Sequence, residues 1–444
     1  MNRYILFIIW LLCHIMPKGV CAQSFTTEDS LQKIITIDEM LSLADENSLA
    51  LRPAKTSVNE TLQGIKTARN ALLPEIEASV SVSYIGNGTM WDRHFSDKNK
   101  APMPHFGNNF TIEASQTVYS GGAISHNITI ARLQSENARW ELEENRNSIR
   151  FMLVSYYLDL FKLRNISNVY KLNISQTQQV LDELRIKEAE GIILHNDITR
   201  YELQLANLEL ELSRIKNSIR IANQHLTVSL GLPNETEIIP DTMLLHNGIG
   251  INDEYIWTQT ALEQSPALKQ SALAIEMEKH KEKIVRSERI PKIAIFAGDI
   301  LDGPILIEVP PIDKNFNYWY VGIGVKYNFD ALFKSQCNLS RSKLSIQRSR
   351  EAYDYAKEQT ELAISSEYIR FLECFQTLDT RKKSVELANR NYFVVHHRYQ
   401  NEMALITDML DAGNAKLSAE VDLANAQIDI IFNYYKLRYI SGTL

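Results

Sequence analysis

Four segments of this chain alternate apolar and polar residues with a period of two, which is typical of β-strands that face two different environments. They lie at about 75–84, 109–118, 292–299 and 317–328, and so form two widely separated pairs. Each comes close to the 9–11 residues that a tilted strand needs to cross a bilayer, although 292–299 is the weakest. Aromatic residues stand near their ends, as in membrane strands. One face can therefore meet lipid while the other meets water.

Four strands are too few to close a barrel, because the smallest closed membrane barrels have about eight strands. An open sheet edge in hydrocarbon leaves backbone N–H and C=O groups unpaired, which is not tolerated. The chain is therefore expected to share a barrel with copies of itself. Three copies with twelve strands is the natural number, although two or four copies also satisfy the argument. The alternative is a pair of soluble antiparallel hairpins that cap a helical bundle.

An internal repeat relates the two halves of the chain. Matching residues keep the same order at nearly constant offsets: Ser48 with Ser265 and Pro74 with Pro291 at 217, then Asp197 with Asp408, Leu226 with Leu437 and Gly231 with Gly442 at 211. This pattern indicates a duplication. We place the first repeat at 23–231, a linker rich in Pro, Gly and Asn at 232–253, and the second repeat at 254–444.

Long helices are predicted between the strands. The 444 residues contain only 12 Pro and 17 Gly, which favours helix. We expect helices at about 38–72, 122–190, 195–230, 254–290, 334–402 and 406–441. The helix at 195–230 carries one apolar seam with steps of four and three residues, and the helix at 406–441 carries two. Two seams suit a helix with a neighbour on each side, as in a closed wall of helices, although a buried bundle helix remains an alternative.

The N-terminus and the charge indicate the compartment. Residues 1–22 have the features of a secretory signal, with Cys21 as an alternative lipid anchor. The signal contains two basic residues and no acid, so the mature charge is 45 − 54 = −9, which argues against nucleic acid as a partner. Cys337 and Cys374 fall on one predicted helix, roughly 55 Å apart at helical rise. They cannot form a disulfide with each other.

Short motifs at the ends of these elements resemble the TolC-like outer membrane efflux protein family, over essentially the whole mature chain. The motifs are Leu72-Leu73-Pro74, Tyr119-Ser120-Gly121-Gly122, Leu230-Gly231-Leu232-Pro233, Thr407-Asp408-Met409-Leu410-Asp411-Ala412 and Ser441-Gly442-Thr443-Leu444. Two positions depart from the family pattern. Asp330-Ala331-Leu332 replaces the glycine pair usual after the fourth strand, and Glu402 stands where the first repeat has Gly191.

The resemblance implies a mainly α fold with transmembrane β-strands. A homotrimer would form a twelve-stranded β-barrel in the lipid of the outer membrane, continuous with a long coiled-coil α-helical barrel in the periplasm. Its function would be that of the exit duct of a tripartite efflux or secretion system, with passive export. The implied partners are a periplasmic adaptor (membrane fusion) protein and an inner-membrane pump.

The resemblance also implies a gate at the periplasmic tip. Asp408 and Asp411 share one helix face and would form the constriction of the closed tunnel, although acids in a first helical turn are also favoured by the helix dipole. Tyr399 and Asp197 match a family pair that holds the mouth shut by a hydrogen bond. The alternative is that Tyr399 packs in a seam and Asp197 caps a helix. Gly121 and Gly122 are expected to form a strand-to-helix turn.

No catalytic, cofactor-binding or metal-binding pattern is present in the sequence, so an enzyme is not expected. His396 and His397 are adjacent, and one helix face cannot present both to a metal. A secreted coiled-coil stalk or adhesin is the alternative function, but it would not need four strands of membrane length. A periplasmic adaptor would carry one helical hairpin between β-domains, without this duplication.

Overall fold

The computed structural model describes residues 32–241, 250, 253–308 and 311–444. The predicted signal at 1–22, with Cys21, lies outside the described residues, as does much of the predicted linker. The elements in chain order are β1 (Gln32–Ile35), α2 (Ile37–Asn47), η1 (Leu49–Leu51), α3 (Arg52–Arg69), η2 (Asn70–Leu72), β2 (Glu75–Tyr84), β3 (Gly88–Trp91), β4 (Lys98–Ala101), β5 (Phe106–Tyr119), α4 (Ala123–Ala189), α5 (His195–Leu230), β6 (Glu237–Pro240), α6 (Glu254–Gln264), α7 (Pro266–Ser287), β7 (Lys292–Gly303), β8 (Phe316–Lys326), α8 (Ala331–Gln400) and α9 (Ile406–Ile440).

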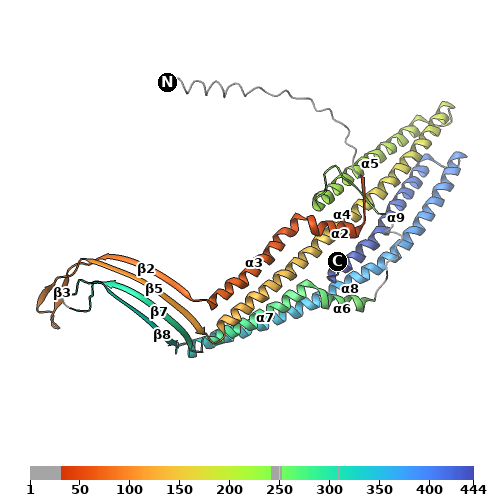
Figure 1. The fold of residues 1–444 in the computed structure, drawn as a ribbon. Helices are drawn as coiled ribbons and strands as arrows, with labels where there is room; N and C mark the ends of the chain where they lie inside the picture. The colour runs from red at the N-terminus through yellow and green to blue at the C-terminus, as the bar shows by residue number, and fades with distance from the viewer. Residues whose placement is uncertain (1–31, 242–249, 251–252, 309–310) are drawn as a thin grey trace, which may run out of the picture.

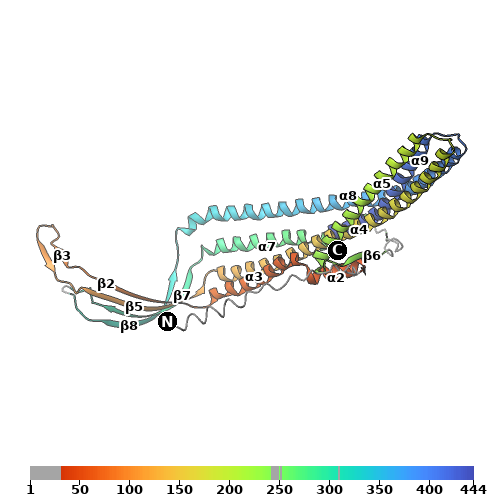
Figure 2. The same cartoon turned by 90° about the horizontal axis from the view of Figure 1, so that it is seen from above.

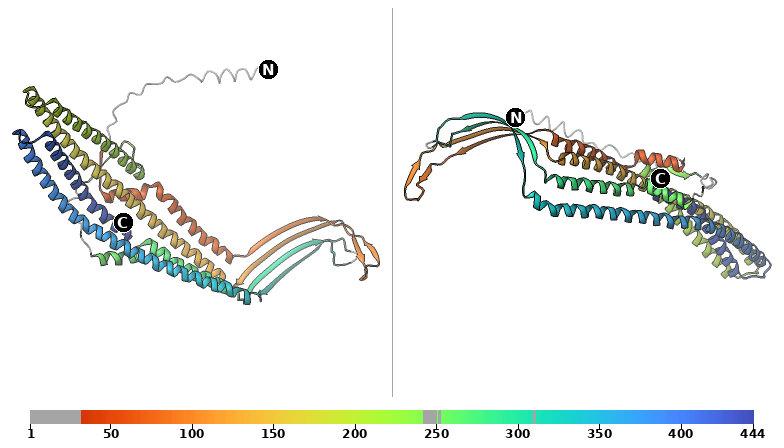
Figure 3. Two further views of the ribbon diagram at one scale, coloured as in Figure 1. Left: turned by 180° about the vertical axis from the view of Figure 1, so that it is seen from behind. Right: turned by 90° about the horizontal axis from the view of Figure 1, so that it is seen from below.

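The protomer is a long, bent rod with the strands at one end and helical hairpins at the other (Figures 1 and 2). The tips of the α4–α5 and α8–α9 hairpins lie side by side, far from the sheet (Figure 3). The short helices α2 and α6 flank the middle of the rod. At about 1.5 Å per residue, the 67 residues of α4 extend for roughly 100 Å.

The predicted helices are confirmed, with one correction in each repeat. The helices expected at 38–72 and 254–290 are each broken, at Ser48 and Ser265, where ψ is 119° and 118°. Ser265 precedes Pro266, and the proline ring disfavours helical ψ at the preceding residue. Pro53 similarly lacks the N–H that would continue a helix through the break in the first repeat. Cys337 and Cys374 both lie on α8, as expected, and both are free.

Equivalent positions of the two repeats share unusual backbone conformations. Gly191 and Glu402 follow the long helices with φ of 74° and 59°, and Gly231 and Gly442 end the last helices with φ of 67° and 76°. Each of these pairs is separated by 211 residues. Left-handed φ is strained for a residue with a side chain, so Glu402 adopts at a cost the turn that Gly191 makes freely.

The main sheet has four antiparallel strands in the order β2-β5-β7-β8. Its central pair joins the repeats, because β5 belongs to the first and β7 to the second. β5 and β7 extend over 14 and 12 residues, longer than the ranges expected from the sequence. Both edges, β2 and β8, are unpaired among the described residues, so this single chain shows no closed barrel.

Two small sheets were not predicted. β1 pairs in parallel with β6, and β3 forms a hairpin with β4 in the segment between β2 and β5. Each of these strands has only four residues, which is too short to show a clear period of two.

The main hydrophobic core lies at the middle of the rod, where α2, α4, α5 and α9 meet. Tyr157 is fully buried there, and its hydroxyl donates to the carbonyl of Ile35 at 2.6 Å. The same oxygen accepts from the N–H of Asp241 at 2.8 Å. Burial raises the pKa of this phenol to about 12. Tyr157 thus fixes the β1–β6 pair against α4.

No helix within the described ranges combines the length and apolar character needed to cross a membrane.

Candidate functional site

One face of the four-stranded sheet is apolar and exposed. The strand register places Ile76 beside Ala114, Val80 beside Phe110, and Ile295 beside Ile323. Seven side chains of the two edge strands on this face are between 67 and 75% exposed: Ile76, Val80, Val82, Trp319, Val321, Ile323 and Val325. A contiguous exposed apolar surface of this kind is unfavourable in water and suits lipid.

The opposite face is polar along β2 and β5. Ser79 lies beside Thr111, and Glu77 lies directly opposite Glu113. Two like charges opposite each other on a sheet repel unless the surface is well hydrated. This face is therefore suited to water.

On β7 and β8, this second face of the sheet carries aromatic residues. Their position was not predicted from the sequence. Tyr320 donates to the carboxylate of Glu113 at 2.8 Å, and it lies over Gly298, where a Cβ would come within 2.6 Å of the ring. Phe296 covers Gly322 in the same way. The available signal was that Tyr318, Tyr320, Gly322 and Gly324 follow one another at every second residue of β8, because large side chains over glycines are a known stabilising device in sheets.

Gly121 and Gly122 lie between β5 and α4, with φ of 63° and 86°. A Cβ on Gly121 would come within 3.0 Å of Ile290, so this turn requires glycine for space as well as for conformation. The corresponding exit from β8 differs. Asp330 has a helical φ of −64° and pairs with Lys334 at 3.0 Å. The glycine pair is not needed there because the chain leaves the strand by a different turn.

The predicted aperture residues lie at the far tip. Asp408 and Asp411 are both exposed in the first turns of α9. The Asp408 carboxylate accepts the backbone N–H of Leu405 at 3.0 Å, so it also satisfies the start of the helix. Asp411 has no hydrogen bond or ion pair recorded among the described residues. The structure thus places the two carboxylates together on an exposed tip.

Tyr399 and Asp197 are close enough to interact electrostatically but form no hydrogen bond within one protomer. Burial raises the pKa of the Tyr399 phenol, and the charge of Asp197 raises it further. The Tyr399 hydroxyl is buried and lacks a hydrogen-bond partner among the described residues. Lys187 lies 5.0 Å from the centre of its ring. Asp197 does not occupy the N-cap of α5, which is Leu194.

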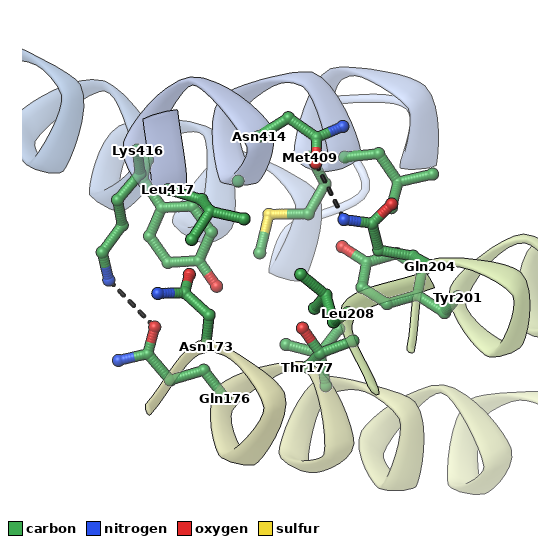
Figure 4. Close-up of a pocket in the computed structure, with 14 residues that line it drawn as sticks. Asn173, Gln176, Thr177, Tyr201, Gln204, Leu208, Met409, Asn414, Lys416 and Leu417 are labelled. Atoms are coloured by element: carbon green, nitrogen blue, oxygen red, sulfur yellow. Dashed lines mark hydrogen bonds between the residues drawn. The ribbon is translucent and has the colours of Figure 1, made fainter. Parts of the chain in front are cut away.

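A polar contact between the two helical hairpins was not anticipated from the sequence. Lys416 on α9 is only 8% exposed, and its ammonium donates to the amide oxygen of Gln176 on α4 at 2.9 Å (Figure 4). Gln204 on α5 donates to Asn414 on α9 at 2.8 Å. These residues line a small cavity of about 40 Å³.

The turns at the two tips expose apolar side chains. Leu194 and Leu405, which precede α5 and α9 at equivalent positions, are 75% and 70% exposed. No group of three or more His, Cys, Asp or Glu side chains in the described part of the chain is arranged to hold a metal ion.

Comparison with known proteins agrees with this architecture. The family model described as "Outer membrane efflux protein" matches residues 40–232. This match and the similarities that follow indicate a TolC-like outer membrane efflux protein. It is 18% identical to the outer membrane efflux protein BepC of Brucella suis biovar 1 (strain 1330), over 92% of this chain and 86% of that protein.

Two further similarities support the assignment. The chain is 22% identical to the outer membrane protein TolC of Escherichia coli (strain K12), over 50% of this chain and 46% of that protein. The fold is similar to that of the outer membrane protein VceC of Vibrio cholerae, with a TM-score of 0.73 and 14% identity over 91% of this chain and 96% of that one. BepC, TolC and VceC are all outer membrane proteins, in agreement with the location expected from the sequence. At the family level these relatives are channels and not enzymes.

Proposed function

We propose that three copies of this efflux protein close a twelve-stranded barrel and form the exit duct of a tripartite efflux or secretion system, through which solutes leave passively. The observation that carries the proposal is the open four-stranded sheet. Its apolar face is exposed and both of its edges lack partners within the described chain.

The sheet edges make a single copy unstable in lipid. β2 has 10 residues and β8 has 11. About half of the backbone groups of an edge strand point outward, so each edge presents roughly ten unpaired N–H and C=O groups. Each costs several kcal/mol in hydrocarbon, so two open edges cost tens of kcal/mol. Pairing β2 of one copy with β8 of the next removes this cost.

The distal tip supports a gate that favours cations. In a trimer, Asp408 and Asp411 would supply six carboxylates around one mouth, and rings of carboxylates attract cations and repel anions. The Tyr399 hydroxyl, which has no hydrogen-bond partner in the part of the chain that the structure describes, and the nearby Asp197 would complete a lock once the hairpins approach each other. A bond of a phenol to a carboxylate contributes about 1.5–3 kcal/mol.

The exposed tip leucines support docking of a partner. Leu194 and Leu405 form an apolar tip on each hairpin, repeated around a trimer, that a periplasmic adaptor protein could cover. An adaptor in this position would connect the duct to an inner-membrane pump. We assign no cargo, because a passive duct takes its selectivity mostly from the pump.

The test is to purify the full chain from outer membranes in detergent, measure its mass, and record its conductance in planar bilayers. We expect a trimer with cation-selective channels that divalent cations block. Asp408→Ala combined with Asp411→Ala should raise the conductance and weaken the block. The matched control is Asp182→Ala with Asp379→Ala, which removes two exposed acids of α4 and α8. A monodisperse, water-soluble monomer would sink the proposal, and trimers without conductance would favour the stalk.

A further inference from the structure

Two histidines from different repeats meet just below the sheet. His126 lies in the first turns of α4 and His280 lies on α7, 154 residues later. Their Nδ1 atoms are 3.1 Å apart, and their ring centres are 5.1 Å apart with an angle of 57° between the planes. The backbone N–H of His126 bonds to the carbonyl of Gly122 at 3.0 Å, so the strand-to-helix turn fixes its position.

The separation of the two nitrogens fits a metal chelate. A divalent transition metal binds imidazole nitrogen at about 2.0–2.1 Å, so two nitrogens at bond angles between 90° and the tetrahedral angle lie about 2.9–3.4 Å apart. The observed 3.1 Å falls within this range. The same distance also fits a plain hydrogen bond in which one ring donates to the other. The two interpretations differ in what the site can bind.

The surroundings disfavour protonation of both imidazoles, and the neutral ring is the form that binds metal. Burial lowers the pKa of His126, and the charges of His280 and Lys283 lower it further. Burial and Lys283 also lower the pKa of His280, whereas Glu276 opposes the shift. No third ligand is assembled with the pair within the described residues, so water would complete the coordination.

We propose that His126 and His280 form a two-imidazole chelate for a divalent transition metal, which links α4 of the first repeat to α7 of the second at the base of the sheet. Nitrogen ligands bind Cu²⁺ more tightly than Ni²⁺ or Zn²⁺. A bound ion would join the two repeats where the membrane strands meet the periplasmic helices. Sequence spacing could not reveal this site because the ligands are far apart in the chain.

The test uses the full detergent-solubilised protein, with any polyhistidine tag removed, titrated with Cu²⁺ and then with Ni²⁺. Binding is followed by calorimetry, and the Cu²⁺ spectrum by electron paramagnetic resonance. We expect a site with two nitrogen ligands whose Cu²⁺ affinity falls at least tenfold in His126→Gln, in His280→Gln and in the double variant. Glutamine retains a polar side chain of similar reach, which preserves helix contacts. The control is His225→Gln, because His225 stacks on Tyr156 elsewhere in the fold.

The outcomes separate chelation from hydrogen bonding. Cu²⁺ should raise the midpoint of thermal unfolding of the parent and of His225→Gln, and should leave that of the double variant unchanged. Equal Cu²⁺ affinity in the parent and in the double variant, with both folded by circular dichroism, would overturn the proposal. A spectrum with a single nitrogen ligand in the parent would overturn it as well. Neither measurement requires transport activity, so the result is independent of the proposed duct.

Discussion

Replacing Lys416 with methionine tests whether a buried lysine holds the two helical hairpins together. Its ammonium donates to Gln176 at 2.9 Å and lies 3.9 Å from Glu420 and 4.9 Å from the centre of the Tyr392 ring. Methionine keeps most of the apolar stem, so the change removes the charge and the bond to α4 with little loss of packing.

The structure sets the size of the effect. The charge-assisted bond to Gln176 is worth about 1.5–3 kcal/mol. The ion pair with Glu420 adds less because it is long, and Glu420 retains a donor, Asn173, at 3.0 Å. We expect the substitution to destabilise the closed state by about 2 kcal/mol relative to the open state. This change shifts the ratio of closed to open channels roughly 30-fold toward the open state.

The assay is the open probability of single channels in planar bilayers. Lys383→Met is the matched control, since Lys383 pairs with Glu386 on the exposed surface of its own helix, where little stability is at stake. A double-mutant cycle with Gln176→Leu should give a coupling of about 1–2 kcal/mol, because the two side chains share one bond. An unchanged open probability in Lys416→Met, or a coupling near zero, would refute the reasoning.

Three further predictions address the turns and the tip. Tyr399→Phe should raise the open probability of single channels, because it removes the hydroxyl proposed to bond to Asp197 in the closed trimer; an open probability equal to that of the parent would count against that lock. Gly442→Ala should lower the free energy of unfolding by about 2 kcal/mol, since the residue has left-handed φ and the new Cβ would lie 2.8 Å from the carbonyl oxygen of Gln264. Gly231→Ala should lower it less, and the guanidinium concentrations at the midpoint of unfolding compare the two variants. Burial raises the pKa of Tyr201 above the usual 10.0, so its contribution to stability is complete below pH 10 and is lost as pH rises. Above pH 10, the thermal midpoint of Tyr201→Phe should therefore fall less steeply with pH than that of the parent. Equal slopes of thermal midpoint against pH in the two proteins would contradict this.

The long helices could be predicted because their apolar periodicity extends over many turns. Helices such as α5 and α9 repeat an apolar seam over 36 and 35 residues, so single substitutions do not obscure the period. The breaks at Ser48 and Ser265 were missed because helix resumes within a few residues of each, so the helical character of the surrounding sequence hardly changes. β1 and β6 were missed because a pair of four-residue strands depends on a contact between distant parts of the chain.

Among the candidate site residues, those close together in the sequence could be predicted and those far apart could not. Asp408 and Asp411 could be chosen because they are neighbours on one helix and belong to a family motif. Lys416 with Gln176, and His126 with His280, are separated by 240 and 154 residues. Their meeting depends on how whole helices pack, and one sequence contains no local signal for it.

The way the repeats are joined limits where the duct can open. β5 of the first repeat and β7 of the second pair antiparallel from Asn108 to Tyr119, with one register shift between Thr117 and Tyr119, so the strand end is expected to move as one body. At the middle of the rod, a fully buried core locks α2, α4, α5 and α9 together. Nearer the tip, the hairpins share a smaller buried apolar cluster from α4, α5 and α9. Polar bonds such as Lys416 to Gln176 and Gln204 to Asn414 also connect them beside a small cavity. The cost of separating apolar side chains grows with the area exposed, and the polar groups can bond to water instead, so separation costs less at the tip than at the central core. Opening is therefore expected by separation of the distal hairpins, with the sheet and the central core as the fixed frame.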